Sequence, residues 1–487
     1  MYFDYFGKDC FAAVTEGDKL VEFHLDSDGA SDISGNIYKG RIVNVVNGMQ
    51  AAFVAFGQPK NGYLYAGDIP AGVEVPLSEK LNVKVGDEVM VQVLKSPIGT
   101  KGARLSMNLS FVGKNLIYLP GTPFLGVSRK ITEEEEREKL LATAEKLRFS
   151  GDGLIMRTNA RGTQMRVLKT EITYLRSLYL STLEAYKEAG VGDLIYREAD
   201  VHFRLLRDID IDTVDKIYIG SETVFKKVEN LFRKTGKKKK LELYNGKTEM
   251  FDHFGLEKQI YEFTSPRVEL ESGAYLIIER TEALTVIDVN TGRFTGDTAL
   301  EETVFATNLL AAREVARQAR LRNLGGIVVV DFIDMDKEEH RAAVLEELTN
   351  CLKQDRAKCN VSGMSGLGLV SFTRRKVKVD NMTMLGKTCP HCRGTGVVLS
   401  DSYIAFRIKI ALRRCFFEGY ENAIVELNAG VYSEIVSKKM FTDMVTGEWR
   451  NKRVYMIPHR TYHEEFFTVR GDNNTVLTLP ESAKLLY

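Results

Sequence analysis

Two apolar, β-branched stretches, residues 283–290 and 325–335, constrain this chain most, because each ends in polar side chains that a buried strand does not need. Each run has the composition of a buried strand. Residues two apart on a strand point to the same side, so Asp288 and Asn290 would project together. If the two strands are neighbours, Asp331 joins them in an all-oxygen site.

Two carboxylates and one amide oxygen predict a magnesium site. Mg²⁺ binds proteins through one or two carboxylates and completes its octahedron with water and substrate phosphate. The alternative is that Asp288 and Asp331 cap strand ends or pair with basic side chains.

Composition and length narrow the class of protein. A chain of 487 residues predicts about three domains. No run of eighteen apolar residues indicates a membrane span, and the N-terminus lacks the basic start and apolar core of a signal peptide. Six cysteines are too few for a disulfide scaffold, so we expect a reducing, cytoplasmic setting. The net charge of +1 neither favours nor excludes a nucleic-acid partner.

Residues 36–107 contain several short alternating strands with glycine turns, which predict a small barrel. Their pattern resembles the OB-fold RNA-binding domain named after a large ribosomal protein. In that case Phe53 and Tyr63 would stack on bases, and Lys95 and Lys101 would hold phosphates. The alternatives are that the two rings belong to the barrel core and that Lys101 is a solvated turn residue.

A second candidate site follows an apolar strand that ends at residue 156. A guanidinium fork beside a hydroxyl suits a terminal phosphate, and Arg157 and Thr158 provide both. The alternative is an ordinary salt bridge and turn. The flanking residues, about 132–148 and 168–189, are expected to be helical.

A Cys-x-x-Cys motif at Cys389 and Cys392, followed by glycines, is half of a structural zinc site. Structural zinc takes four ligands, and the chain has no second motif of this kind. His391 is badly placed for the same metal, so two chains would each give two thiolates to one shared Zn²⁺. The alternatives are a redox pair, for which the expected βαβ context is missing, or two unliganded thiols.

Four stretches together resemble the bacterial ribonuclease E/G family: residues 282–290, 308–326, 330–335 and 389–396. The resemblance covers nearly the whole chain in the family's domain order, and the carboxylate spacing makes it specific. Because the sequence given ends soon after the cysteine motif, it is most similar to the short members, which lack a long disordered scaffold.

The resemblance implies an α+β multidomain protein. The expected parts are a catalytically silent ribonuclease-H-like domain split between residues 1–35 and 201–264, the OB-fold domain at 36–107, a 5′-phosphate sensor at 108–200, a DNase I-like α/β catalytic domain at 265–385, a zinc link at 386–398, and a small α+β domain at 399–487.

The resemblance also implies roles for single residues. Asp288 and Asp331 match the magnesium ligands, with Asn290 beside them. Lys358 stands where the family commonly has a catalytic Arg, which keeps the charge but loses the bidentate fork.

The remaining matches lie outside that site. The RNA contacts of the OB-fold correspond to the two rings and two lysines named above. Arg157 and Thr158 match the 5′-phosphate sensor, with backbone at Gly113 and Ile117 lining its pocket. The cysteine pair matches a zinc link that joins two protomers as a homodimer, alone or within a tetramer.

The implied activity is magnesium-dependent hydrolysis of internal phosphodiesters in single-stranded RNA, leaving a 3′-hydroxyl and a 5′-phosphate. A 5′-monophosphate would stimulate it, and its roles would lie in ribosomal RNA maturation and mRNA turnover. Two rival hypotheses are a non-catalytic RNA-binding assembly protein and a deoxyribonuclease. The carboxylate set argues against the first, and the OB-fold argues against the second.

Overall fold

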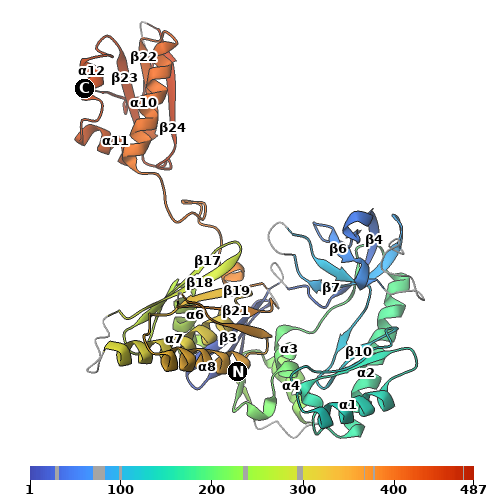
Figure 1. The fold of residues 1–487 in the computed structure, drawn as a ribbon. Helices are drawn as coiled ribbons and strands as arrows, with labels where there is room; N and C mark the ends of the chain where they lie inside the picture. Colours follow the sequence, from blue (N-terminus) through green and yellow to red (C-terminus); the bar gives the residue numbers. More distant parts are fainter. Residues whose placement is uncertain are drawn as a thin grey trace. The chain divides into compact units, whose positions relative to one another are not determined.

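The computed structural model divides into two compact units, Met1–Leu385 and Gly386–Tyr487, and each is described by itself. None of the described helices is long and apolar enough to cross a lipid bilayer. Figure 1 shows the fold. The described residues are 1–27, 32–69, 83–97, 101–233, 240–292, 300–366, 368–376, 379–474 and 477–486.

A small closed barrel lies early in the first unit (Figure 1, blue strands). It closes because β4 pairs with both β5 and β7, in the strand order β13-β4-β5-β6-β8-β7. Gly40 is needed at the close approach of two strands, since a Cβ atom there would lie 2.5 Å from the Val54 side chain. The predicted small barrel is confirmed. Its elements are β4 (Ile37–Val46), η1 (Asn47–Met49), β5 (Ala51–Ala55), β6 (Gly62–Tyr65), η2 (Ala66–Asp68), β7 (Glu88–Lys95), β8 (Arg104–Ser106) and β13 (Leu194–Tyr196).

A four-stranded sheet with two helices follows the barrel. Its order is β11-β12-β10-β9, and Leu116, Tyr118 and Leu154 are buried beneath the helices. The two helices predicted on either side of residue 157 are present. The elements are β9 (Phe111–Val112), β10 (Leu116–Leu119), β11 (Leu125–Val127), α1 (Glu134–Leu147), β12 (Gly153–Met156), η3 (Thr158–Ala160) and α2 (Met165–Glu188).

The first strands of the chain pair with strands that come about 200 residues later. In the sheet of order β15-β14-β1-β2-β3, Tyr2 stands opposite Tyr218 on a parallel neighbour. Strands from residues 2–26 and from residues 217–243 therefore build one sheet. The elements are β1 (Tyr2–Phe6), β2 (Asp9–Glu16), β3 (Lys19–Asp26), α3 (Val201–Asp208), η4 (Ile211–Thr213), β14 (Ile217–Ile219), α4 (Glu222–Arg233), β15 (Leu241–Leu243), α5 (Met250–His253) and α6 (Leu256–Thr264).

A six-stranded mixed sheet contains the two apolar stretches at residues 283–290 and 325–335. Its order is β16-β17-β18-β19-β21-β20, and β18 and β19 are parallel because α7 forms the crossover between them. Ile287, Val328 and Val330 of these strands are buried with apolar residues of α7 and α8. The elements are β16 (Arg267–Glu269), β17 (Tyr275–Arg280), β18 (Leu284–Asn290), α7 (Leu300–Leu321), β19 (Gly326–Asp331), α8 (Glu338–Lys353), β20 (Cys359–Met364), β21 (Leu369–Arg374) and α9 (Asn381–Leu385).

The second unit is a small α+β module with its own core around Ile408, Val425 and Trp449. Its sheet follows the order β24-β22-β23-β25. The elements are α10 (Asp401–Phe417), β22 (Asn422–Asn428), α11 (Ala429–Ser437), α12 (Thr442–Thr446), β23 (Arg453–His459), β24 (Phe467–Asp472) and β25 (Lys484–Leu485).

Candidate functional site

The two carboxylates singled out in the sequence lie side by side. Asp288 and Asp331 are register partners on the parallel strands β18 and β19. Both side chains are exposed, whereas Ile287 and Val330, which precede them, are buried. Strands alternate faces and neighbouring strands lie about 4.8 Å apart, so both carboxylates leave the sheet on one side within reach of one cation.

Asn290 lies beside this pair through an amide that acts as a donor. Its Nδ2 donates to Asp288 Oδ2 at 2.8 Å. The amide therefore fixes the orientation of one carboxylate, which is a different contribution from the carbonyl ligand expected from the sequence.

A third carboxylate, Asp334, lies close enough to influence the pair, and the sequence argument missed it. Burial raises the pKa of Asp331, and the charges of Asp288 and Asp334 raise it further. The signal for Asp334 in the sequence was its position three residues after Asp331, within the stretch 325–335. Three acidic side chains that repel one another form a site that a cation would stabilise.

These residues fit a magnesium ion that keeps most of its water. Within the described ranges, no three His, Cys, Asp or Glu side chains are grouped closely enough to hold a metal by themselves. Mg²⁺ needs only one or two carboxylates, since waters and substrate phosphate complete its shell. Asp288 and Asp331 would hold it.

Lys358 does not join this cluster within the chain. It is exposed and directly precedes β20, whose first residue pairs with Arg374. Arg374 in turn pairs with Gly326, which is at the opposite end of β19 from Asp331. Five residues of strand separate the two ends by about 16 Å, so Lys358 lies well away from the carboxylates.

The barrel presents a row of aromatic and basic side chains. Phe53 pairs with Tyr63, Tyr63 with Arg104, and Arg104 with Lys95 across four neighbouring strands. The two rings meet edge to face at 6.1 Å and are partly exposed, so they are not barrel core. Arg104 was missed by the sequence argument; it is exposed and bonded to Asp68.

Lys101 is also exposed, on the segment that leads into β8. Lys95 and the two rings predicted from the sequence therefore lie at one face of the barrel, and Lys101 lies three residues before Arg104 of that row. Part of the turn predicted around Lys101, residues 98–100, lies outside the described residues.

The Arg157 guanidinium is held from two sides. Its Nη1 donates to the carbonyl of Gly113 at 2.5 Å, and its Nη2 donates to Asp208 Oδ1 at 2.8 Å. Asp208 also accepts from Arg207 Nε at 3.2 Å. Burial tends to raise the pKa of Asp208, but the guanidinium groups of Arg207 and Arg157 hold it below its ordinary value.

Thr158 and Ile117 line the same cavity as Arg157. The cavity has a volume of about 900 Å³ and lies between the four-stranded sheet, α3 and the start of β20. The Thr158 hydroxyl is exposed and lies 3.1 Å from that of Ser128. All four residues predicted for a phosphate sensor are therefore gathered here, with a carboxylate, Asp208, that the sequence did not indicate.

The cysteine pair lies in the second unit. Cys389 is exposed and Cys392 is partly exposed. Backbone amides of Gly396 and Gly394 lower the pKa of Cys392, so the turn favours its thiolate form. Two thiols fit half of a tetrahedral site. His391 is bonded through its carbonyl oxygen to His463 Nε2 at 2.7 Å.

Comparison with known proteins connects these sites. The model of the Ribonuclease E/G family matches residues 110–377, and that of the S1 RNA binding domain matches residues 31–108. Ribonuclease G of Escherichia coli K12 is 38% identical over 411 residues, which cover 81% of this chain and 83% of that protein. Ribonuclease G of Haemophilus influenzae is 36% identical over 471 residues, 94% and 96% of the two chains. Ribonuclease E of Escherichia coli K12 is 33% identical over 81% of this chain and 38% of its own.

Proposed function

Since this chain belongs to the ribonuclease E/G family and is an endoribonuclease of that type, we propose that it cuts single-stranded RNA with the carboxylates Asp288 and Asp331 and a bound Mg²⁺. The observation that carries the proposal is the pairing of these two residues on adjacent parallel strands. RNA is the favoured substrate because the barrel is an S1 RNA-binding domain with a row of rings and cations.

The chain's own residues have distinct parts in the proposed reaction. Asp288 and Asp331 would hold the ion beside the scissile phosphodiester, and Asn290 orients Asp288. When bound, Mg²⁺ supplies charge neutralisation at the phosphate and a more acidic water. No His or Ser nucleophile is required, and the products carry a 3′-hydroxyl and a 5′-phosphate.

Lys358 is left out of the proposed catalytic set. The strand register separates it from the carboxylates by about 16 Å. It lies instead next to residues 354–357, which line the cavity of Arg157. A positive charge at that edge would help to hold an RNA backbone there.

The cavity around Arg157 would bind the 5′-monophosphate of the substrate. Gly113 and Asp208 fix the guanidinium, and the exposed hydroxyl of Thr158 supplies a further donor. The guanidinium N–H groups that are not bonded to Gly113 or Asp208, together with this hydroxyl, are suited to one phosphate group. A 5′-hydroxyl end forgoes this contact, so monophosphorylated RNA would be the better substrate.

The cysteine pair would join two chains through one Zn²⁺, because a closed structural site takes four ligands and each chain offers two thiolates. The resulting assembly is a homodimer, alone or within a tetramer. The cellular work proposed for it is maturation of ribosomal RNA and turnover of mRNA in the cytoplasm, as particular forms of the RNA processing that its family carries out.

The test is cleavage of a 5′-monophosphorylated, AU-rich oligoribonucleotide with Mg²⁺ or with EDTA. We expect cutting by the wild type only with Mg²⁺, and none by Asp288→Asn or Asp331→Asn, while both variants still bind the RNA. Asp336→Asn is the matched control, because Asp336 is exposed but outside the pair. Retained magnesium-dependent cleavage in either variant would refute the assignment, and equal cutting of single-stranded DNA would refute the choice of substrate.

A further inference from the structure

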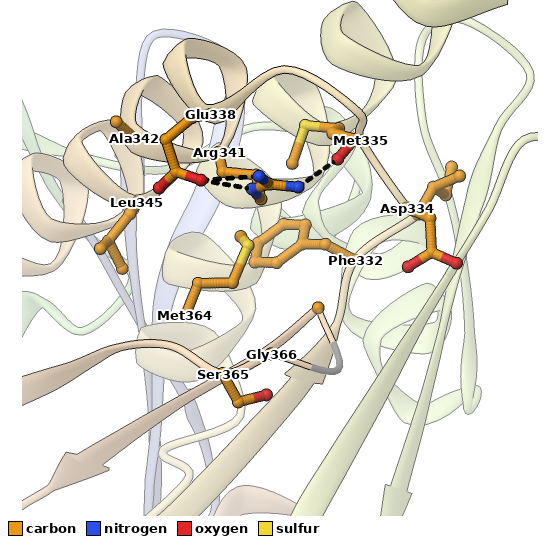
Figure 2. A pocket seen from close by; sticks show the side chains of 12 residues that line it. Phe332, Asp334, Met335, Glu338, Arg341, Ala342, Leu345, Met364, Ser365 and Gly366 are labelled. Carbon is orange, nitrogen blue, oxygen red and sulfur yellow. Dashed lines mark hydrogen bonds and ion pairs between the residues drawn. The ribbon is translucent and has the colours of Figure 1, made fainter.

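A cavity of about 440 Å³ opens directly beyond the carboxylate strand (Figure 2). It lies between the segment that follows β19, the first turns of α8 and residues Ser365, Gly366 and Gly368. Its volume is in the range of pockets that bind small organic groups. The function proposed above makes no use of this cavity.

The walls of the cavity are more polar than apolar, and a group of apolar side chains supplies the apolar part. They include Phe332 and Met335 after β19, Ala342 and Leu345 on α8, and Met364 at the end of β20. Figure 2 shows the Phe332 ring and the Met364 side chain close together on one wall. Phe332 and Met335 are almost fully buried, so a flat group in the cavity would contact chiefly Ala342, Leu345 and the Met364 thioether.

The one cation on this wall is already used. Arg341 donates through Nη1 to the carbonyl of Met335 at 2.6 Å, and through Nη2 and Nε to Glu338 Oε2 at 2.6 and 3.0 Å. Figure 2 shows these contacts at the upper rim. The guanidinium thus closes the wall, and it is poorly placed to attract a phosphate.

Asp334 provides the acceptor at the other side of the cavity. Among the described residues its carboxylate has no hydrogen-bond or ion-pair partner, and Figure 2 shows it at the edge of the cavity. Its Oδ1 lies 3.2 Å from the position that a Cβ atom on Gly368 would occupy. Gly368, with a φ of +76°, thus lets the carboxylate approach the β20–β21 turn.

Asp334 also links the cavity to the catalytic pair. It follows Asp331, the last residue of β19, by three residues, and it lines the cavity. A phosphodiester positioned at Asp288 and Asp331 would therefore have its neighbouring nucleotide at the mouth of the cavity.

We propose that this cavity binds one unstacked nucleobase next to the scissile phosphodiester, and that Asp334 selects a base with an exocyclic amino group. Adenine N6 and cytosine N4 are amino donors to a carboxylate, and guanine offers its N2 amino group from another edge, whereas uracil has no amino group and carries the carbonyl oxygen O4 where cytosine has N4. The cavity is thus a determinant of cleavage position. This inference rests on the proposed single-stranded RNA cleavage.

The test uses single-stranded RNA with randomised bases on both sides of a cut site. The RNA carries a 5′-hydroxyl, so that Arg157 takes no part, and the products are sequenced. For the wild type we expect one position near the cut at which uracil is disfavoured about tenfold. Ala342→Phe fills the cavity from an exposed position and should flatten this preference and raise KM about tenfold. Glu346→Phe, one helical turn further and outside the lining, should keep the wild-type profile.

Asp334→Asn gives a second reading that does not depend on filling the cavity. An amide can donate to the uracil carbonyl, so this variant should accept uracil at the same position, whatever its overall rate. An unchanged base profile in both Ala342→Phe and Asp334→Asn, with cleavage retained, would overturn the inference alone. Failure of the wild type to cut any RNA with Mg²⁺ would overturn the proposed function and this inference with it.

Discussion

Asp288 and Asp331 face each other as register partners on two parallel strands, and no ion pair neutralises either carboxylate among the described residues. Two acidic groups at this separation repel each other, and Asp334 adds to the repulsion. The arrangement weakens the fold slightly in the absence of a cation, which gives the metal site a signature that needs no activity assay.

The first prediction concerns stability and pH at Asp331. Because burial and two neighbouring carboxylates raise its pKa in the folded state, the folded protein binds the proton more tightly than the unfolded chain does. Stability is therefore lost as pH rises through the folded pKa. Without metal at neutral pH, Asp331→Asn should melt at a slightly higher temperature than the wild type.

Added Mg²⁺ should reverse that order. A ligand at a hundredfold excess over its Kd stabilises by about 2.7 kcal/mol, so the wild type should gain several degrees and Asp331→Asn very little. Differential scanning calorimetry with Mg²⁺ and with EDTA measures both effects. An equal gain in both proteins would place the metal elsewhere.

The second prediction concerns Arg157. A charge-assisted fork contributes about 1.5–3 kcal/mol, roughly ten- to a hundredfold, so the wild type should cut monophosphorylated RNA that much faster than 5′-hydroxyl RNA at low substrate concentration. Arg157→Ala should lose this advantage, mainly through KM. Arg161→Ala is the matched control, because Arg161 is on the same loop and pairs with Glu133 at the surface. If Arg157→Ala slows both substrates equally, its role is structural.

The third prediction concerns Asp208, the carboxylate that holds Arg157. Its pKa is depressed in the folded state despite burial, so its contribution to stability is present above the unfolded pKa and is lost as pH falls through the folded pKa. Asp208→Asn should cost about 1 kcal/mol at neutral pH, a modest amount because the side chain is 30% exposed. Urea unfolding at a series of pH values should show this difference vanish in acid. A difference that persists in acid would show that the charge is not responsible.

The fourth prediction concerns the row of aromatic and basic side chains on the barrel strands. Stacking of a base on an aromatic ring contributes about 1–3 kcal/mol, so Phe53→Ala or Tyr63→Ala should weaken binding of single-stranded RNA by that amount. Arg104→Gln should weaken binding less and lower the salt dependence by about one charge. Phe124→Ala is the control, since that ring is exposed on the neighbouring sheet. Unchanged affinity in both ring variants, measured by fluorescence anisotropy, would exclude this face.

The fifth prediction concerns the cysteine pair. The wild type should hold about one Zn²⁺ per two chains, because each chain gives two of four thiolates. Cys389→Ser with Cys392→Ser should abolish the bound zinc and shift the protein toward monomer. Cys415→Ser is the control, since Cys415 is buried in the core of the second unit. Metal analysis measures the zinc content per chain, and light scattering measures the molar mass in solution. One zinc per chain, or an unchanged mass in the double variant, would mean that other ligands hold the metal.

The sequence by itself determined the parts that depend on local pattern. The alternation around Phe53 and Tyr63 predicted barrel strands, and the apolar runs that end at Asp288 and Asp331 predicted two buried strands with carboxylates at their ends. Such patterns are readable because strand and helix periods fix which side chains share a face.

Only the tertiary structure decided which groups from distant segments meet. Arg157 and Asp208 are 51 residues apart, and their contact depends on how α3 packs near the four-stranded sheet, which no local period encodes. Arg104 is a second example: it lies beside Tyr63 and Lys95 because of the register of the barrel strands, which no local period encodes. Lys358 shows the converse: the family pattern placed it with the carboxylates, but the direction of β20 puts it at the far end of the sheet. Sequence periodicity fixes the face on which a side chain lies, whereas register and strand direction fix its neighbours.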